Sequence, residues 1–327
     1  MIQNKLTKVH YLYPPKMEAL ALLEGRLDPD VQLTFGPDLP EGADYQILVA
    51  GRPTHETLRA SPELKVLVIP YAGVSDITRQ TLAEYPHVRV HNLHHNAAPT
   101  AEMAITLLLA AAKFLVPIDR AMRVHDWRPR YQPNPAVLLE GKTALILGYG
   151  AIGQHVGRVL RAMGTRVLGV RRNPSPDDSA EIYPVTALPE LLPQADILMV
   201  TLPLTPETEG MIGEKELALL PAGAILTNVG RGAVVDQKAL YDALKTGYLY
   251  AAGLDVWYNY PPDEAARECT PPADYPFHEL DNVVMSPHRG GGSMETEQIR
   301  MEHLALTLNA AARGEPIPNP VDLEAGY

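Results

Sequence analysis

Short β-type runs alternate with helix-type patterns along the first third of the chain. Runs rich in Val, Ile, Leu and Tyr occupy residues 8–13, 46–51, 65–70 and 88–90. Helical patterns occupy residues 17–27 and 76–85 between them. The order β-α-β-α predicts a parallel sheet with helices on both faces.

A long apolar helix is expected over residues 98–115, APTAEMAITLLLAAAKFL. A helix that is apolar nearly all round has to be buried. Thr100 is a candidate cap, because its hydroxyl can accept a hydrogen bond from a free N–H of the first turn. Residues 127–135, which contain Pro and Arg, read as an irregular connection.

A second alternating series follows. Its predicted strands are residues 143–147, 165–170, 196–201, 222–229, 250–255 and 282–286. Its predicted helices are residues 152–163, 214–220 and 237–246, and a last helix over 294–313 leads toward the C-terminus. The two series predict an α/β protein with two Rossmann-like domains, each a doubly wound parallel sheet.

A glycine-rich loop, Gly148-Tyr149-Gly150-Ala151-Ile152-Gly153, joins the first strand of this second series to its first helix. The first glycine permits a tight turn, the second lets the backbone approach a diphosphate, and the third allows close packing of helix on strand. The helix N-terminus would offer free N–H groups and its positive dipole end to the phosphates. The context of strand, loop and helix indicates a dinucleotide site.

Arginines follow the next strand, at Arg171 and Arg172. An NAD site commonly has Asp or Glu at this point, where it bonds the ribose 2′-hydroxyl. Arg171 can instead pair with a 2′-phosphate, which an acid would repel. We therefore expect NADP to be preferred, with NAD possible. A solvated strand end is the alternative explanation of the two arginines.

The chain of 327 residues carries a formal net charge of −11 and a single cysteine, Cys269. An acidic chain is repelled by nucleic acid and by anionic membranes, so we expect neither as a partner. One cysteine allows no disulfide within the chain, and the first 16 residues lack the apolar core of a signal peptide. These features predict a cytoplasmic protein. The histidines show no metal-ligand spacing, so no metal is expected.

From residue 98 onward, five motifs resemble those of the D-isomer-specific 2-hydroxyacid dehydrogenases. They are PTAE at 99–102, the glycine-rich loop, LPLTPET at 202–208, NVGRG at 228–232 and SPHRGG at 286–291. An earlier segment, YAGV at 71–74, is similar to the substrate loop of the family. The resemblance implies a substrate domain of residues 1–97 and 292–327, a cofactor domain of residues 98–291, and an active site in the cleft between them. It also implies a homodimer formed through the cofactor domain.

The resemblance further implies roles for individual residues. Arg231 would bind the substrate and stabilise developing negative charge, and His288 would donate the proton, because imidazole titrates near neutral pH. Backbone N–H groups of Ala72, Gly73 and Val74 would hold the substrate carboxylate. The residues expected at the cofactor, beside the glycine-rich loop and the two arginines, are Thr100, Leu202, Pro203, Thr208, Val229, Gly230, Asp255 and His288. Each also has a structural explanation: a solvated loop for His288, a surface turn for Arg231 and helix capping for Thr100.

One position departs from the family. Where a glutamate normally orients the histidine, this chain has Tyr260. A phenol cannot stabilise imidazolium as a carboxylate does, so the pKa of His288 should be lower than in relatives with the acid. Three explanations are open: Tyr260 is the catalytic partner that orients His288, Glu264 or Glu268 reaches back, or catalysis is weak. Simple packing of Tyr260 is the structural alternative.

Two functions therefore compete. The first is an NADP-preferring oxidoreductase that interconverts a small 2-keto acid, such as glyoxylate or hydroxypyruvate, and its D-2-hydroxy acid. The second is a catalytically weak scaffold or sensor that binds the dinucleotide on the same fold. Arg231 and His288 favour the enzyme, whereas Tyr260 favours the scaffold slightly.

Overall fold

The computed structural model of the chain describes residues 6–174 and 181–324. The chain forms two compact units. The terminal unit comprises residues 1–96 and 293–327, and the central unit comprises residues 97–292. The predicted domain boundaries differ from these junctions by one residue each.

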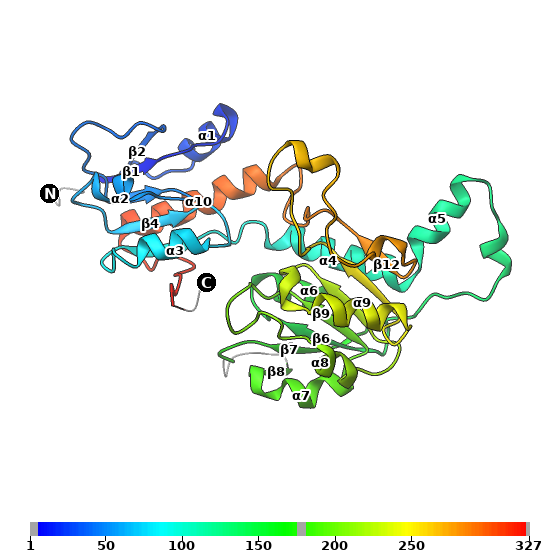
Figure 1. Ribbon diagram of the computed structural model, residues 1–327. Coiled ribbons are helices and arrows are strands. Elements are labelled where there is room, and N and C mark those ends of the chain that lie inside the picture. The colour runs from blue at the N-terminus through cyan, green and yellow to red at the C-terminus, as the bar shows by residue number, and fades with distance from the viewer. Residues whose placement is uncertain (1–5, 175–180, 325–327) are drawn as a thin grey trace. The chain divides into compact units, whose positions relative to one another are not determined.

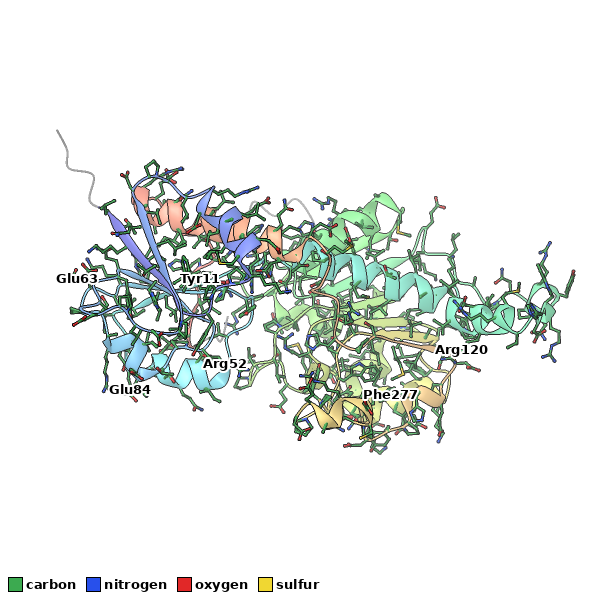
Figure 2. The ribbon with its side chains drawn as sticks, turned by 90° about the horizontal axis from the view of Figure 1, so that it is seen from above. Tyr11, Arg52, Glu63, Glu84, Arg120 and Phe277 are labelled. Atoms are coloured by element: carbon green, nitrogen blue, oxygen red, sulfur yellow. The ribbon has the colours of Figure 1, made fainter. Side chains whose placement is uncertain are left out.

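The terminal unit is built on a five-stranded sheet in which all paired strands are parallel (Figure 1). The strand order is β2-β1-β3-β4-β5. The strands are β1 (Thr7–Tyr11), β2 (Val31–Phe35), β3 (Ile47–Val49), β4 (Val66–Ile69) and β5 (Arg89–Asn92). β3 and β4 are buried along their whole length, as parallel strands covered on both faces should be. Tyr11, labelled in Figure 2, is buried at the carboxyl end of β1.

Helices cover this sheet in two sets. They are α1 (Met17–Glu24), α2 (His55–Arg59), α3 (Asp76–Leu82) and α10 (Thr296–Arg313). α1 and α10 pack on each other, and their Leu23 and Leu304 share one apolar cluster. Leu58 of α2 and Leu82 of α3 belong to a second cluster. Helices α1 and α10, which lie near opposite ends of the sequence, thus contribute to the same apolar core of the terminal unit.

The central unit holds a seven-stranded parallel sheet in the order β12-β11-β10-β9-β6-β7-β8. The strands are β6 (Thr143–Leu147), β7 (Arg166–Val170), β8 (Glu181–Tyr183), β9 (Ile197–Val200), β10 (Ile225–Asn228), β11 (Ala251–Leu254) and β12 (Val283–Met285). The chain winds from β6 toward β8 and then restarts at β9 on the other side of β6. Ligands of open α/β sheets bind at such a reversal, beyond the carboxyl ends of the strands.

Helices of the central unit also form two sets. They are α4 (Ala97–Ala112), α5 (Leu115–Arg123), α6 (Ala151–Ala162), α7 (Leu188–Leu191), α8 (Glu214–Leu219) and α9 (Gln237–Lys245). α4 packs on α6 and on β10 and β11, with Leu108 and Leu160 in one cluster. Leu191 of α7, Leu217 of α8 and Leu240 of α9 lie in the other cluster, together with Phe277 (Figure 2). Successive residues of β6 belong alternately to the two clusters, because a parallel sheet covered by helices on both faces buries both sides of each strand.

Several predicted elements were wrong or missing. The helix predicted over 98–115 ends at Ala112, because Phe114 takes a left-handed conformation (φ 51°) and α5 then starts in a new direction. Thr100 is not the cap of α4, since the helix begins at Ala97 and the Thr100 side chain is buried inside it. Edge strands β2 and β8 and helices α2, α5 and α7 were not predicted. A short 3-10 turn, Arg128–Tyr131, lies within the stretch expected to be irregular.

Within residues 6–174 and 181–324, no single helix has the length and apolar character needed to cross a membrane. α4 and α5 would meet that requirement only as a pair, and they are bent by 70° at their junction.

Candidate active site

The glycine-rich loop follows β6 and opens α6, as predicted. Gly148 has φ +94°, a conformation that side chains disfavour, and a Cβ there would lie 3.0 Å from Thr201. A Cβ on Gly153 would overlap the Gly148 carbonyl oxygen, so glycine is required for this close approach of helix and loop. The Thr201 hydroxyl donates to the Gly148 carbonyl at 2.7 Å and fixes the loop from the neighbouring strand β9.

The loop fits a diphosphate. Gly150 is the N-cap of α6, and no side chain caps the helix there. A Cβ on Gly150 would meet nothing within 4 Å, so the space in front of this helix end is open. Main-chain N–H groups and the positive dipole end of a 12-residue helix face an anion at such a position. Gly148 to Gly153 would therefore hold the phosphates of a dinucleotide.

The Tyr149 side chain turns inward, away from that space. It is 7% exposed, its ring packs against Gly157 and Gly169, and its hydroxyl accepts a hydrogen bond from Arg161 at 2.9 Å. Tyr149 can therefore meet a cofactor through its main chain only. The glycine at 169 is needed because a Cβ there would lie 2.7 Å from the tyrosine ring.

Arg171 and Arg172 follow β7, the strand beside β6. The Arg171 main-chain N–H donates to the Tyr183 carbonyl at 3.1 Å, and the residue is half-buried. Arg172 is exposed and lies 4.0 Å from the Glu207 carboxylate. The carboxyl end of this strand thus carries two arginines, one of them near a carboxylate, at the position where Rossmann folds recognise a ribose 2′ substituent.

The segment 202–208 is a compact turn after β9. The Thr208 hydroxyl donates to the Pro203 carbonyl at 2.7 Å and accepts from the Thr205 main-chain N–H at 2.8 Å. Thr208 is buried, and its side chain serves the turn itself. Leu202 packs beside Gly148 and against Gly230, which links this turn to the glycine-rich loop and to the next strand end.

Arg231 follows β10 in a turn that its neighbours fix. Asn228 accepts from the Gly230 N–H through Oδ1 and donates to the Arg231 carbonyl through Nδ2, both at 3.0 Å. Side chains on Gly230 or Gly232 would overlap the carbonyl oxygens of Leu202 and Trp257. The turn is held tightly while the Arg231 side chain stays exposed. A rigidly based guanidinium of this kind suits a carboxylate or a carbonyl oxygen.

Asp255, directly after β11, organises the loop that carries the histidine. One carboxylate oxygen accepts from the Ser286 hydroxyl at 2.6 Å and from the Arg289 N–H at 2.9 Å, and the other accepts from the Gly290 N–H at 2.8 Å. The Trp257 indole N–H donates to the Ser286 carbonyl at 2.8 Å. Residues 286–290 are thus wrapped around one buried carboxylate.

His288 sits in that loop with φ 58°, a strained conformation that the surrounding contacts maintain. Its Nδ1 lies 2.9 Å from the Tyr260 hydroxyl oxygen, which also accepts from the Trp257 main-chain N–H at 3.1 Å. Desolvation by the surrounding protein, and then the positive charge of Arg231, lower the pKa of His288 below 6.5, although Asp255 acts in the opposite direction. Glu264 is engaged elsewhere, in an ion pair with Arg267 at 2.8 Å.

The central unit therefore gathers Arg231, Asp255 and His288 at the carboxyl ends of three adjacent strands, β10, β11 and β12. The predicted substrate loop, Ala72 to Val74, belongs to the terminal unit, where the Asn92 amide donates to the Ala72 carbonyl at 2.6 Å.

Sequence reasoning missed the supporting residues Thr201 and Trp257. Thr201 directly follows a buried strand, which is the signal that could have pointed to it.

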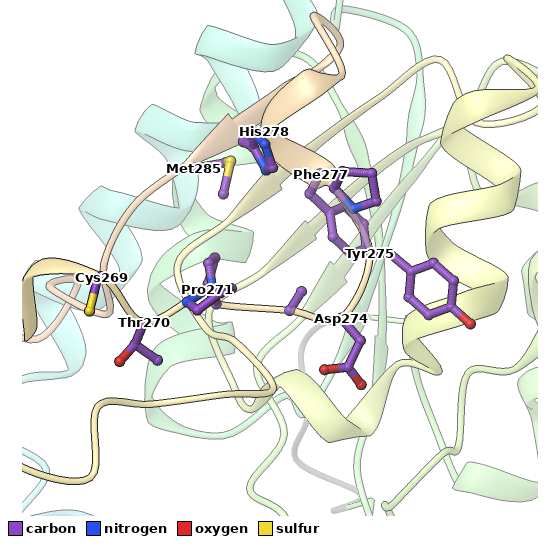
Figure 3. A pocket seen from close by; sticks show the side chains of 11 residues that line it. Cys269, Thr270, Pro271, Asp274, Tyr275, Phe277, His278 and Met285 are labelled. Atoms are coloured by element: carbon purple, nitrogen blue, oxygen red, sulfur yellow. The ribbon is translucent and has the colours of Figure 1, made fainter. Parts of the chain in front are cut away.

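A cavity of about 400 Å³ lies elsewhere in the central unit. It is lined by residues 269–278 and Met285, with Cys269 and His278 on its wall (Figure 3). Arg231, Tyr260, His288 and the glycine-rich loop do not line it, so it is separate from the candidate site.

Comparison with known proteins shows the family to which the chain belongs. Residues 105–290 match the family model described as "D-isomer specific 2-hydroxyacid dehydrogenase, NAD binding domain". The chain belongs to the D-isomer-specific 2-hydroxyacid dehydrogenase family. The recognition of the family and the predicted α/β fold with two parallel sheets are confirmed.

Relatives in this family carry different names. A D-3-phosphoglycerate dehydrogenase of Mycobacterium leprae is 31% identical over 91% of this chain, which spans 56% of the relative's length. A glyoxylate reductase of Korarchaeum cryptofilum is 35% identical over 82% of the chain and 79% of its own length. A D-isomer-specific 2-hydroxyacid dehydrogenase of Xanthobacter autotrophicus, solved with NADPH and MES, matches with a TM-score of 0.79 and 26% identity over 99% of this chain and 100% of its own.

Proposed function

We propose that the protein is an NADP-preferring reductase that converts a small 2-keto acid to its D-2-hydroxy acid. The observation that carries this proposal is the grouping of Arg231 and His288 at adjacent strand ends of a sheet that also bears the glycine-rich loop. Reduction of a 2-keto acid requires two groups from the protein. A guanidinium binds the carboxylate and stabilises the negative charge that develops on the keto oxygen, and an imidazole donates the proton.

The division of labour follows from the contacts. Arg231 binds the carboxylate and keto oxygen and stabilises the charge that develops on the latter. Asp255 does no proton transfer but keeps the 286–290 loop in place, so that His288 presents Nε2 to the keto oxygen. A nicotinamide held by the loop and by residues 202–208 supplies the hydride when bound. The roles predicted for Thr100, Val229 and the Ala72–Val74 N–H groups stay predictions.

The preference for NADP rests on Arg171 and Arg172. Two guanidinium groups at the end of β7 favour a 2′-phosphate through charge-assisted hydrogen bonds, worth about 1.5–3 kcal/mol each. The solved relative with NADPH supports the same choice. Among substrates, glyoxylate and hydroxypyruvate come first, because a relative bears the name glyoxylate reductase.

The test is turnover of a panel of 2-keto acids with NADPH and with NADH. We expect reduction of at least one two- or three-carbon keto acid, with a higher kcat/KM for NADPH than for NADH. Cofactor binding with no turnover of any member of the panel would contradict the proposal and favour the scaffold function.

Assembly as a homodimer is the remaining part of the proposal. α5 has no buried residue, and it and the residues after it expose Leu115, Met122, Val124 and Trp127. An apolar surface of this kind on a helix is typical of an interface. Light scattering of the Leu115→Glu/Met122→Glu variant should show a monomer where the parent is a dimer. Met294→Glu, which changes a still more exposed methionine of the terminal unit, is the control and should leave the dimer intact.

A further inference from the structure

Among the described residues, Nδ1 of His288 is the acceptor that the hydrogen bonds around Tyr260 leave for the phenolic proton. The phenolic oxygen accepts the Trp257 main-chain N–H at 3.1 Å, and that N–H can only donate. The second partner of the oxygen is Nδ1 of His288 at 2.9 Å. A phenol has one O–H to donate, and donating it to Nδ1 satisfies all three groups at once.

The direction of this hydrogen bond decides the tautomer of the histidine. If Nδ1 accepts, the neutral imidazole carries its hydrogen on Nε2, the nitrogen free to face a substrate. A glutamate at position 260 would do the opposite, because a carboxylate only accepts and would hold the hydrogen on Nδ1. With tyrosine at this position, residue 260 donates the hydrogen bond and Nδ1 accepts it, whereas with glutamate Nδ1–H would donate and the carboxylate would accept.

The charges that face His288 agree with a neutral ring. Arg231, in the turn after β10, opposes a positive charge on the imidazole. Asp255, after β11, favours it, but its two oxygens are occupied by the hydrogen bonds from Ser286, Arg289 and Gly290.

We propose that Tyr260 is a positioning residue that holds His288 as the Nε2–H tautomer and passes its own proton through the ring to the reduced keto oxygen. The inference rests on the proposed reductase function. The histidine then works as a neutral relay, and Tyr260 takes the place of the missing carboxylate by a different chemistry.

The step balances. As the hydride arrives at the carbonyl carbon, the keto oxygen becomes an alkoxide and takes the hydrogen from Nε2. The Tyr260 O–H bond breaks, an Nδ1–H bond forms, and the electron pair of the former O–H bond stays on the phenolate oxygen. The ring of His288 remains neutral throughout. The phenolate then accepts hydrogen bonds from Nδ1–H and from the Trp257 N–H. After the product leaves, Nε2 takes a proton from solvent and the Nδ1 hydrogen returns to the phenolate oxygen, which restores the starting pair.

A phenolate is a much weaker base than an alkoxide, so the transfer runs downhill. A neutral imidazole without the phenol would have to become an imidazolate, which is far less favourable. Without Tyr260 the histidine can therefore donate only as imidazolium, a form that becomes scarce above its pKa.

The tautomer can be read directly, without activity. Long-range ¹H–¹⁵N NMR of the full chain, with and without NADPH, distinguishes the two neutral forms of histidine, and His288→Ala identifies the resonance. At about pH 8 we expect Nε2–H in the parent and Nδ1–H in Tyr260→Glu. Nδ1–H in the parent would overturn the proposal whether or not the protein turns over any keto acid.

The pH profile supplies the second readout. Reduction by the parent should persist above the pKa of His288, whereas Tyr260→Phe should lose about tenfold in kcat/KM per pH unit above it. Below that pKa the two proteins should differ by less than about threefold. Tyr260→Glu should recover activity near neutral pH, because the carboxylate raises the histidine pKa.

Tyr131→Phe removes the hydroxyl of a tyrosine that is 83% exposed in the central unit, and it should match the parent throughout. Parallel pH profiles of the parent and Tyr260→Phe would refute the relay. A parent protein that reduces nothing would instead refute the proposed function, and the NMR result would still decide the tautomer.

Discussion

The two units of this chain share one architecture, yet they differ at the turn after the first strand. In the central unit, β6 leads into Gly148 to Gly153, and the first turn of α6 has no acidic residue. In the terminal unit, β1 leads into a turn that contains Pro14 and Pro15, and α1 has Glu18 in its first turn. Prolines offer no N–H, and the acid repels phosphate, so this helix end lacks the features that suit the start of α6 to a diphosphate.

The comparison separates fold from function. Both sheets are parallel and covered by helices, and in both the polar groups gather beyond the carboxyl ends of strands. Within residues 6–174 and 181–324, the combination of an open helix end, two arginines at a strand end and a histidine with a hydrogen-bonded partner occurs only in the central unit. The candidate site therefore depends on a few turns and loops, because the architecture that the two units share does not by itself provide these groups.

Removal of the histidine is expected to have the largest effect on the central unit. His288→Ala should lower kcat/KM for keto-acid reduction by about 10³-fold, because the proton donor is lost, and should change NADPH affinity far less. Steady-state kinetics and fluorescence titration test the two halves of this statement. His278→Ala alters an exposed histidine of the separate cavity and should keep full activity; if both variants were equally active, His288 would not be the donor.

In the terminal unit, a buried histidine should make the free energy of unfolding fall as the pH is lowered. Burial first, and then Arg300, His303 and His94, lower the pKa of His95 from 6.5 to about 4. Below pH 6.5 the unfolded chain takes up a proton that the folded protein refuses until about pH 4, so stability falls over this window by at most about 3 kcal/mol. Urea unfolding of the parent and of His95→Gln across the window should show the parent losing more stability. Equal losses would mean that His95 does not resist protonation.

Replacement of each N-cap residue by aspartate tests the difference between the N-terminal ends of α6 and α1. Gly150→Asp places a carboxylate in the open space before α6, where it can accept the N–H groups proposed for the diphosphate. The helix should gain up to about 1 kcal/mol, while NADPH affinity should fall by about 10²-fold through lost donors and repulsion.

The matched control is Lys16→Asp, at the N-cap of α1. It should give a similar gain in thermal stability with no change in cofactor affinity. Unchanged NADPH binding in Gly150→Asp would show that the phosphates lie elsewhere.

A smaller effect is expected at the end of β7. Arg171→Ala should weaken NADPH binding by about tenfold and leave NADH binding nearly unchanged, because one charge-assisted contact to the 2′-phosphate is lost. Titration with both cofactors measures the ratio. Equal weakening of both would assign Arg171 to the diphosphate or to the strand end.

Much of the fold could be predicted from the chain because the buried strands are continuous apolar runs. β3, β4, β6 and β9 were all expected near their observed positions. The edge strands β2 and β8 escaped prediction because half-exposed residues blur the apolar pattern that marks a strand. Helix α4 was predicted too long because the stop at Phe114 is a backbone conformation and not a composition.

The sequence by itself determined the glycine-rich loop, the cationic strand end and the family, since these lie in contiguous motifs whose chemistry is local. Tertiary structure alone decided which groups meet. Only the parallel order β10-β11-β12 brings Arg231, Asp255 and His288 to one edge, although they are up to 57 positions apart. The same holds for Tyr260: its hydroxyl lies 2.9 Å from Nδ1 and is oriented by a main-chain N–H, because hydrogen-bond direction is a property of three folded groups and not of any one residue.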